Sequence, residues 1–300
     1  MNKKQTTWGN VAEWYDEMLE NNEGTYQKEV ILPNMLRLLS PKKGLIIADV
    51  ACGQGYFSRE FAKAGAKVIA SDISPELVKI AKGKESVKVG GKEKEKEKEK
   101  AEKSQLVEYH VSPADDLTFI KSQSVDKVTI ILAIQNIENA QKVWGEAYRI
   151  LKLGGELHLV LNHPTFRIPK ASFWGFDEKE KEKMKTAGKL SAPGKSPDAG
   201  PAGVQYRRID AYMNERKEKI DMAPGSKKGG DEKENEAKFT YSFHRPLQWY
   251  VKTLGNAGFL ISRLEEWLSH KVSQPGPRAG TENKIRKEIP LFLYMQAVKK

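Results

Sequence analysis

A short apolar run, closed by an acid and then a glycine turn, constrains the fold of this chain most. Leu45–Val50 follows Gly44 and precedes the turn Gly53-Gln54-Gly55. Its length and flanks suit a buried parallel strand better than a helix. The glycines permit a sharp turn that a ligand can approach closely, and N–H groups at the next helix start would face that ligand. The sequence therefore predicts a strand–turn–helix unit with a ligand site at the turn.

The residues around this turn distinguish between ligand classes. A dinucleotide fingerprint has the form G-x-G-x-x-G, and Ser58 stands at its third glycine position. Asp49 at the strand end would repel a pyrophosphate but suits a ligand with an ammonium group. Asp49, Gly53 and Gly55 form the pattern acid-x-x-x-G-x-G, which resembles the first motif of class I methyltransferases that depend on S-adenosylmethionine (SAM). The alternative at this point is a strand–turn–helix unit without a ligand.

A second acid ends the next predicted strand, Lys67–Asp72. It follows Gly53 by nineteen residues, near the spacing at which an acid binds ribose hydroxyls in Rossmann-like folds. We therefore predict that Asp72 binds the ribose and that Ile73 lies against the adenine. The alternative role for Asp72 is to cap the following helix, but Ser74 also suits that cap.

The turn after the third predicted strand, Leu106–Val111, resembles the family's acid-Ala-x-x-Leu turn, which holds the adenine edge. Ala114 and Leu117 fit this pattern, whereas Pro113 stands where the acid often lies. Asp115 or backbone groups are then expected to contact the adenine. In full, the resemblance implies SAM binding by Tyr15, Asp49, Ala51, Cys52, Gly53, Gln54, Gly55, Asp72, Ile73, Ala114, Asp115 and Leu132.

Two amides and two histidines are the candidate catalytic residues. Gln135 and Asn136 follow the fourth predicted strand and resemble the polar pair of ubiquinone and menaquinone C-methyltransferases, which implies substrate positioning; loop capping is the alternative. His163 follows the fifth strand, at the edge where open α/β sheets bind ligands, and would serve as a general base. His244 precedes a predicted helix bounded by Pro246 and Gly258 and would approach the acceptor. A structural role is the alternative for His163.

These elements predict an α/β fold: a Rossmann-like, mostly parallel sheet of seven strands, with helices on both faces and an inserted antiparallel β unit. The family resemblance implies that the last strand is antiparallel. In that unit Tyr206–Met213 and Lys217–Met222 are expected to pair as a hairpin. The helix after the fourth strand is expected to end in a turn at Lys152–Gly155 before the fifth strand begins at Glu156. The resemblance implies that residues 1–43 form a helical lid with Trp14 and Tyr15; an aromatic helix docked on the core is the alternative. The other predicted parts are the SAM-binding core (44–161) with a low-complexity insertion (83–104), a lid or substrate unit (162–243) and the end of the core (244–300).

Composition narrows the remaining possibilities. The only cysteine is Cys52, so neither an internal disulfide nor a cysteine-based zinc site is possible, and no metal site is expected. No apolar run approaches the ~20 residues of a membrane helix, and the N-terminus lacks the apolar core of a signal peptide. These features predict a cytoplasmic protein without a membrane span. The net charge of +11 would suit nucleic acid, but many lysines alternate with glutamates in runs that suit a solvated surface.

The predicted function is transfer of the SAM methyl group to a small-molecule acceptor by in-line displacement. The aromatic residues between Phe166 and Phe243 favour a small acceptor, and Gln135-Asn136 favours a quinone-like or other hydrophobic ring. An RNA methyltransferase, using lysines as phosphate contacts, is the first alternative. A SAM-binding protein without catalysis is the second. A nicotinamide dehydrogenase is the least favoured, because of Asp49 and Ser58. The oligomeric state is not predicted.

Overall fold

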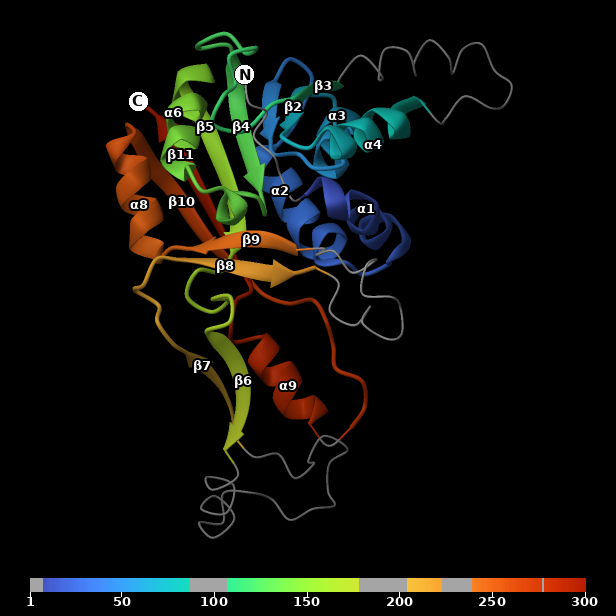
Figure 1. Ribbon diagram of the computed structural model, residues 1–300, viewed down its shortest axis with the longest axis vertical. Helices are drawn as coiled ribbons and strands as arrows, with labels where there is room; N and C mark the ends of the chain where they lie inside the picture. Colours follow the sequence, from blue (N-terminus) through green and yellow to red (C-terminus); the bar gives the residue numbers. More distant parts are fainter. Residues whose placement is uncertain (1–7, 87–106, 178–203, 223–238, 277) are drawn as a thin grey trace, which may run out of the picture.

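The computed structural model describes residues 8–86, 107–177, 204–222, 239–276 and 278–300 (Figure 1). A seven-stranded sheet forms the centre, in the order β10-β11-β5-β4-β1-β2-β3. All neighbours pair in parallel except β11, which is antiparallel to both β5 and β10. The predicted sheet, with its antiparallel last strand, is therefore confirmed. The strands are β1 (Ile46–Val50), β2 (Lys67–Asp72), β3 (Val107–Val111), β4 (Val125–Ile131), β5 (Leu151–Asn162), β10 (Phe259–Trp267) and β11 (Phe292–Lys299).

Helices cover both faces of this sheet, because successive side chains of its buried strands point to opposite sides. In β1, Ile47 packs in one buried cluster with Met35 and Phe61, whereas Ala48 packs in the other with Trp144. The fold thus has a hydrophobic core on each side of the sheet. The helices are α1 (Ala12–Asn21), α2 (Leu32–Leu39), α3 (Tyr56–Lys63), α4 (Pro75–Ser86), α6 (Ala140–Ile150), α8 (Leu247–Asn256) and α9 (Ala279–Arg286), with short turns η1 (Gly9–Val11), η2 (Gln27–Ile31) and η3 (Ile134–Asn136).

Two element boundaries differ from the predictions. Helix α6 ends at Ile150 and β5 begins at Leu151, so the predicted turn at Lys152–Gly155 lies inside the strand. There the β4–β5 register shifts: Val125 pairs with Leu151, but Lys127 pairs with Glu156. Helix α4 continues past Gly83 to Ser86, and the rest of the predicted insertion lies outside the described residues.

The inserted antiparallel unit consists of two separate two-stranded sheets. One pairs β6 (Ser172–Asp177) with β7 (Val204–Ile209), and the other pairs β8 (Arg216–Asp221) with β9 (Phe239–His244). The predicted hairpin was therefore wrong, since each of its strands pairs with another segment.

Cross-strand contacts explain the pairing of β6 with β7. The guanidinium of Arg207 lies 4.8 Å from the ring centroid of Trp174, and Gly175 leaves room for the ring of Tyr206. In Figure 1 the β8–β9 hairpin crosses beside the carboxyl end of β4, while β6 and β7 extend away from the sheet with α9 beside them. The hairpin, rather than β6 and β7, is therefore the part of the insertion nearest the predicted ligand edge.

Candidate functional site

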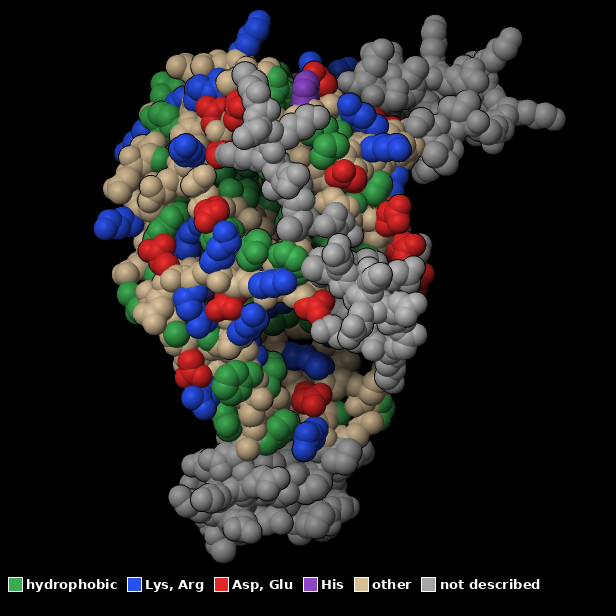
Figure 2. All heavy atoms as spheres, viewed as in Figure 1, with side chains coloured by type: hydrophobic (Ala, Val, Ile, Leu, Met, Phe, Trp, Pro, Cys, Tyr) green, Lys and Arg blue, Asp and Glu red, His purple; other side chains and the backbone are tan. Residues whose placement is uncertain are grey.

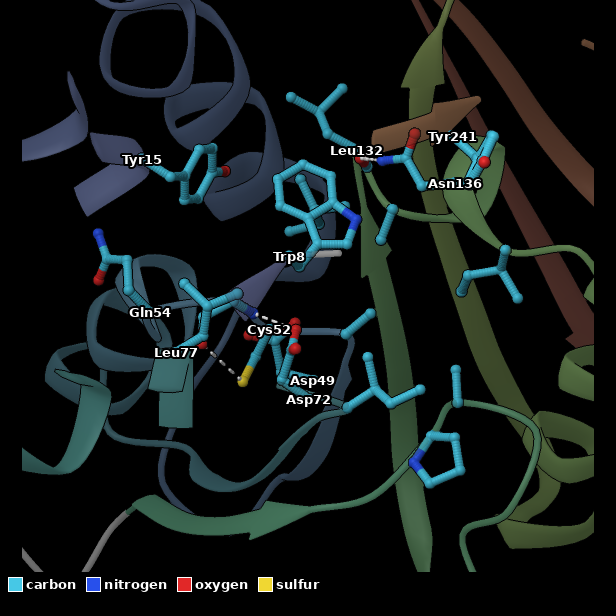
Figure 3. Close-up of a pocket in the computed structure, with 18 of the residues that line it drawn as sticks. Trp8, Tyr15, Asp49, Cys52, Gln54, Asp72, Leu77, Leu132, Asn136 and Tyr241 are labelled. Carbon is cyan, nitrogen blue, oxygen red and sulfur yellow. Dashed lines mark hydrogen bonds between the residues drawn. The ribbon is translucent and has the colours of Figure 1, made fainter. Parts of the chain in front are cut away.

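A cavity of about 600 Å³ lies at the carboxyl ends of β1, β2 and β4 (Figure 3). Its volume falls within the range of small-molecule sites. The glycine turn, the ends of β2 and β4, the 113–115 loop, the N-terminal segment and the β8–β9 hairpin all contribute to it. It is lined by Trp8, Tyr15, Leu19, Asp49, Ala51, Cys52, Gly53, Gln54, Tyr56, Phe57, Asp72, Ile73, Leu77, Pro113, Ala114, Asp115, Ile131, Leu132, Ala133, Asn136, Ile137, Glu138, Asn139, Lys217, Tyr241 and Phe243.

The structure gathers eleven of the twelve predicted SAM-binding residues around this cavity. The exception is Gly55, which caps the N-terminus of α3 in a left-handed conformation (φ 77°). A Cβ at Gly55 would lie 2.6 Å from the hydroxyl of Tyr109, so this glycine is required by the turn and by close packing.

Two non-glycine residues adopt left-handed backbone at the cavity. Ala51 (φ 57°) follows β1 and Leu132 (φ 53°) follows β4. Such conformations are uncommon outside glycine and cost roughly 1 kcal/mol or more, so neighbouring contacts must hold them. Leu132 N–H donates to Val160 O at 2.7 Å, and Cys52 N–H, next to Ala51, donates to Ser71 O at 2.9 Å. The ends of two adjacent strands are thereby held in strained turns that border one cavity.

Asp49 is a buried carboxylate at the end of β1. Only 2% of the residue is exposed, and burial raises its pKa to about 6. Hydrogen bonds from two hydroxyl groups oppose this effect of burial and lower the pKa. Ser58 donates to one of its oxygens at 2.5 Å and Thr129 donates to the other at 2.8 Å. Ser58, the residue that breaks the dinucleotide pattern, therefore orients the acid that favours an ammonium.

Asp72 connects three pieces of backbone at the end of β2. Its Oδ2 accepts the N–H of Gly53 at 2.8 Å, and its Oδ1 accepts the N–H of Ser74 at 2.9 Å. Ser74 Oγ in turn accepts the N–H of Leu77, so it caps α4 as predicted. Burial raises the pKa of Asp72, and the backbone hydrogen bonds oppose that effect. Asp72 lines the cavity but is not free of protein contacts.

Gln54 lines the cavity and carries a buried side-chain donor that has no partner among the described residues. Arg59 donates to Gln54 Oε1 at 2.8 Å and to the Gln54 carbonyl at 2.6 Å. Because a guanidinium only donates, the amide must turn its oxygen toward Arg59. Its Nε2 is buried and finds no acceptor among the described residues. Unpaired buried donors are uncommon in folded proteins, so this nitrogen is available to an acceptor atom that reaches it.

The N-terminal segment covers one side of the cavity. Tyr15 of α1 lines it as predicted, together with Leu19, but Trp8 lines it instead of Trp14. The rings of Trp8 and Tyr15 meet edge to face with centroids 5.8 Å apart. Burial raises the pKa of Tyr15 to about 12, and the charge of Asp72 adds to this effect. The Tyr15 phenol therefore stays neutral and serves as a hydrogen-bonding and apolar wall.

The two amides after β4 take different positions. Asn136 lines the cavity, and its Nδ2 donates to Leu132 O at 3.4 Å. Gln135 is buried outside the lining and donates to the same carbonyl at 2.8 Å. The structure thus brings Asn136 to the cavity, whereas Gln135 supports the left-handed turn at Leu132.

Neither candidate histidine lines the cavity. Thr165 N–H donates to His163 Nδ1 at 3.2 Å, so the Nε2 hydrogen of His163 is donated to Glu266 at 2.7 Å. Burial lowers the pKa of His163 and of His244. His244 Nε2 donates to the carbonyl of Tyr212 at 2.8 Å. Burial therefore favours the neutral form of both imidazoles, although the hydrogen bonds to Glu266 and to the Tyr212 carbonyl oppose this effect.

The sequence predicted that aromatic residues of the insertion contribute to substrate selectivity, but it identified neither Lys217 nor the strand pairing. Lys217 of β8 and Tyr241 and Phe243 of β9 line the cavity. Alternation along Phe239–Phe243 placed its aromatic residues on one face, which was the available signal. Within the described residues, no group of three His, Cys, Asp or Glu side chains is placed to hold a metal, and no helix is long and apolar enough to cross a bilayer.

Comparison with known proteins agrees with this geometry. Residues 48–159 match the family described as methyltransferase domain. A ubiquinone biosynthesis O-methyltransferase of Xanthomonas oryzae pv. oryzae is 32% identical over 116 residues, which are 39% of this chain and 42% of that protein. The chain thus spans less than half the length of this relative.

Solved structures resemble the whole fold. A SAM-dependent methyltransferase from Mesorhizobium loti has a TM-score of 0.60 at 20% identity, covering 92% of this chain and 100% of that one. A putative SAM-dependent methyltransferase from Listeria monocytogenes has a TM-score of 0.56 at 20% identity, covering 89% and 97%. At this identity the structures support the fold, and the sequence match supplies the family of the matched region. Residues 48–159 therefore match a methyltransferase domain, within a fold that SAM-dependent methyltransferases of known structure share.

Proposed function

We propose that the protein is an enzyme that transfers the methyl group of SAM to a small-molecule acceptor. The observation that carries this proposal is a single cavity with two chemically different ends. Buried acids and the glycine turn form one end, and the β8–β9 hairpin with Asn136 forms the other (Figure 3). A cofactor site and an acceptor site in one cavity is what methyl transfer between two ligands requires.

The residues at the glycine-turn end fit the functional groups of SAM. Asp72 keeps carboxylate lone pairs for ribose hydroxyls beyond those used by the two backbone donors. Asp49 offers a buried negative charge for the ammonium, and Gln54 Nε2 offers an unused donor for the carboxylate. Ile73 and Ala114 offer apolar surface for the adenine. Each polar group of the cofactor therefore has a counterpart of suitable chemistry.

The protein's own contribution is alignment and exclusion of water. SAM, when bound, supplies a methyl group that its sulfonium already activates toward displacement. Trp8, Tyr15 and the hairpin enclose the space in which the acceptor must be oriented. Asn136 is the candidate to position the acceptor, since its side chain reaches that space. His163 and His244 could transfer a proton to or from a ligand only if a rearrangement brought them to the cavity.

Three observations favour a small molecule over RNA as the acceptor. The cavity has the volume of a small-molecule site and aromatic walls on the acceptor side. The similar Xanthomonas protein is named for a quinone pathway. On the face drawn in Figure 2, basic and acidic side chains of the described residues are interspersed rather than gathered in one basic patch. The chain's net charge of +11 is the observation that keeps RNA as the second candidate.

Fractionated cell extract tests this proposal. The protein would be incubated with SAM and either a low-molecular-mass filtrate or total RNA, and release of S-adenosylhomocysteine (SAH) would be measured. We expect the filtrate to stimulate SAH release and RNA to leave it at background, with the Asp72→Asn variant inactive as control. Stimulation by RNA alone would replace the small molecule with RNA. SAM binding without stimulation by either fraction would favour the non-catalytic alternative.

A further inference from the structure

One face of the β8–β9 hairpin carries lysines on β8 and aromatic rings on β9. Residues directly opposite in an antiparallel pair share a face, and here Lys217 is opposite Phe243 and Lys219 is opposite Tyr241. Lys217, Tyr241 and Phe243 line the cavity, whereas Lys219 does not. The ammonium of Lys219 lies 3.8 Å from the ring centroid of Phe239, outside the cavity lining. The hairpin thus offers one cavity lysine and one matched lysine outside it.

Lys217 is positioned over aromatic rings and only loosely paired with an acid. Its Nζ lies 4.7 Å from the ring centroid of Tyr241 and 5.3 Å from that of Phe243. It also pairs with Glu138 at 3.4 Å, but the two side chains are 45% and 66% exposed. An exposed pair at this separation contributes little to stability. An anionic group on a ligand can therefore take the place of Glu138 beside Lys217.

The charges of the cavity are arranged along its length. Asp49 and Asp72 lie at the glycine-turn end, while Lys217 lies at the hairpin end. In Figure 3, Asn136 and Tyr241 stand across the cavity from Tyr15 and Gln54. Lys217 already places a positive charge over the rings, so a cationic ligand would be repelled there. The Nδ2 of Asn136 donates to Leu132 O, and no described residue donates to its Oδ1, which can accept a hydrogen bond from a hydroxyl or amine.

We propose that the hairpin end of the cavity binds a planar aromatic acceptor that carries an anionic group, with the ring against Tyr241 and Phe243 and the anion against Lys217. This inference rests on the proposed function and specifies its acceptor. Lys217 is the residue that selects the charge, and Tyr241 is a residue that selects the ring.

Two probes of the same ring and nearly the same shape, one anionic and one neutral, test the proposal. Calorimetric titrations of 2-naphthoate and its neutral analogue 2-naphthamide would be made into the 300-residue chain saturated with SAH. The variants are Lys217→Gln, its matched control Lys219→Gln, Glu138→Gln and Tyr241→Leu. Lys217, Lys219, Glu138 and Tyr241 are all exposed, so the substitutions are expected to leave the fold intact.

The expected pattern separates charge from ring recognition. The wild type should bind 2-naphthoate about tenfold more tightly than 2-naphthamide, and Lys217→Gln should abolish this preference by weakening naphthoate alone. Lys219→Gln should leave both affinities unchanged. Glu138→Gln should strengthen naphthoate binding by about threefold, because the competing carboxylate is gone. Tyr241→Leu should weaken the binding of both probes by a similar factor.

Three results would overturn the proposal: no binding of either probe, equal binding of the two by the wild type, or a preference that survives Lys217→Gln. Equal loss in Lys217→Gln and Lys219→Gln would also overturn it, since it would indicate a general surface effect. Titration of SAH alone distinguishes this failure from that of the proposed function. Normal SAH binding without a preference for naphthoate refutes only the proposed acceptor class. Absence of SAH binding refutes the cofactor site on which the acceptor proposal rests.

Discussion

Asp72 accepts the backbone N–H of Gly53 at 2.8 Å, although nineteen residues separate them in the chain. The other oxygen of the same carboxylate accepts the N–H of Ser74 at the start of α4. One side chain therefore fixes the glycine turn after β1 relative to the end of β2. The ligand-binding role inferred for Asp72 and this structural role share one carboxylate, so both must be measured together.

Replacement of Asp72 should weaken SAM binding and lower stability at the same time. Asp72→Asn keeps the shape of the side chain, but its NH2 group would face one of the two backbone N–H groups that the carboxylate accepts. We expect this mismatch of two donors to lower the free energy of unfolding by roughly 1–3 kcal/mol. SAM affinity should fall at least about tenfold, because ribose hydroxyls lose a charged acceptor. Calorimetry and urea unfolding measure the two effects, with Glu108→Gln on the exposed side of β3 as control. Unchanged SAM affinity in a folded Asp72→Asn variant would remove Asp72 from the site.

The raised pKa of Asp49 predicts how SAM binding depends on pH. Its pKa of about 6 exceeds the ordinary value of 3.8, so the folded state holds this proton more tightly than the unfolded state. Protonated Asp49 therefore stabilises the folded state relative to the ionised form. This contribution is fully present below about pH 4 and is lost as the pH rises through 6, above which ionised Asp49 lowers the free energy of unfolding by about 3 kcal/mol. An ammonium beside Asp49 would favour the ionised form. SAM binding should therefore release a proton and strengthen between pH 5 and 7.

Calorimetry in two buffers of different ionisation enthalpy measures this proton release. Asp49→Asn should bind SAM more weakly and lose most of the pH dependence in that window. Affinity that falls from pH 5 to 7, or that keeps its pH dependence in Asp49→Asn, would contradict the pairing of Asp49 with the ammonium.

The two glycines of the turn should respond differently to the same substitution. A Cβ at Gly55 would meet the Tyr109 hydroxyl at 2.6 Å, whereas a Cβ at Gly53 would lie at an ordinary contact distance of 3.6 Å from a Tyr15 ring carbon. Both residues have positive φ, so each Ala substitution costs about 1 kcal/mol in backbone strain. Gly55→Ala should cost about 2–4 kcal/mol in total, because packing is also disturbed.

Chemical denaturation of the two variants measures this contrast, and Tyr109→Phe should recover part of the Gly55→Ala loss by removing the hydroxyl. Equal losses in Gly53→Ala and Gly55→Ala would show that backbone strain alone determines the need for glycine here.

The placement of the histidines predicts a separation of stability from cofactor binding. His163→Asn breaks the contact with Glu266, and His244→Asn breaks that with the Tyr212 carbonyl. We expect each variant to lose about 1–3 kcal/mol of stability while SAM affinity stays within twofold. Thermal melting and calorimetry provide the two measurements. If either variant lost far more turnover of an identified acceptor than its loss of stability explains, that histidine would be assigned a catalytic role.

The sheet and the glycine-turn end were predictable from sequence because their signals are local. Asp49, Gly53 and Asp72 lie where strands end, and parallel strands bring those ends to one edge. The role of Ser58 was not predictable in the same way. Its bond to Asp49 depends on how α3 packs against β1, which the glycine spacing does not encode.

The acceptor end was less predictable because its pairing is not local. β8 pairs with β9 across residues 223–238, and β7 pairs with β6 across 178–203, so the nearest neighbours in sequence gave the wrong hairpin. Lys217 reaches the cavity through the pairing of β8 with β9, whereas Trp8 lies there against Tyr15 of the N-terminal segment. Likewise, His163 lies at the expected sheet edge, but its side chain contacts Glu266 instead of the cavity.

Calorimetric titration of the purified protein with SAM and then with SAH tests the central claim most directly. We expect both to bind at one site with micromolar affinity, and Asp72→Asn to weaken both. Absence of binding by both ligands, in protein shown to be folded, would contradict the assignment of this cavity to SAM.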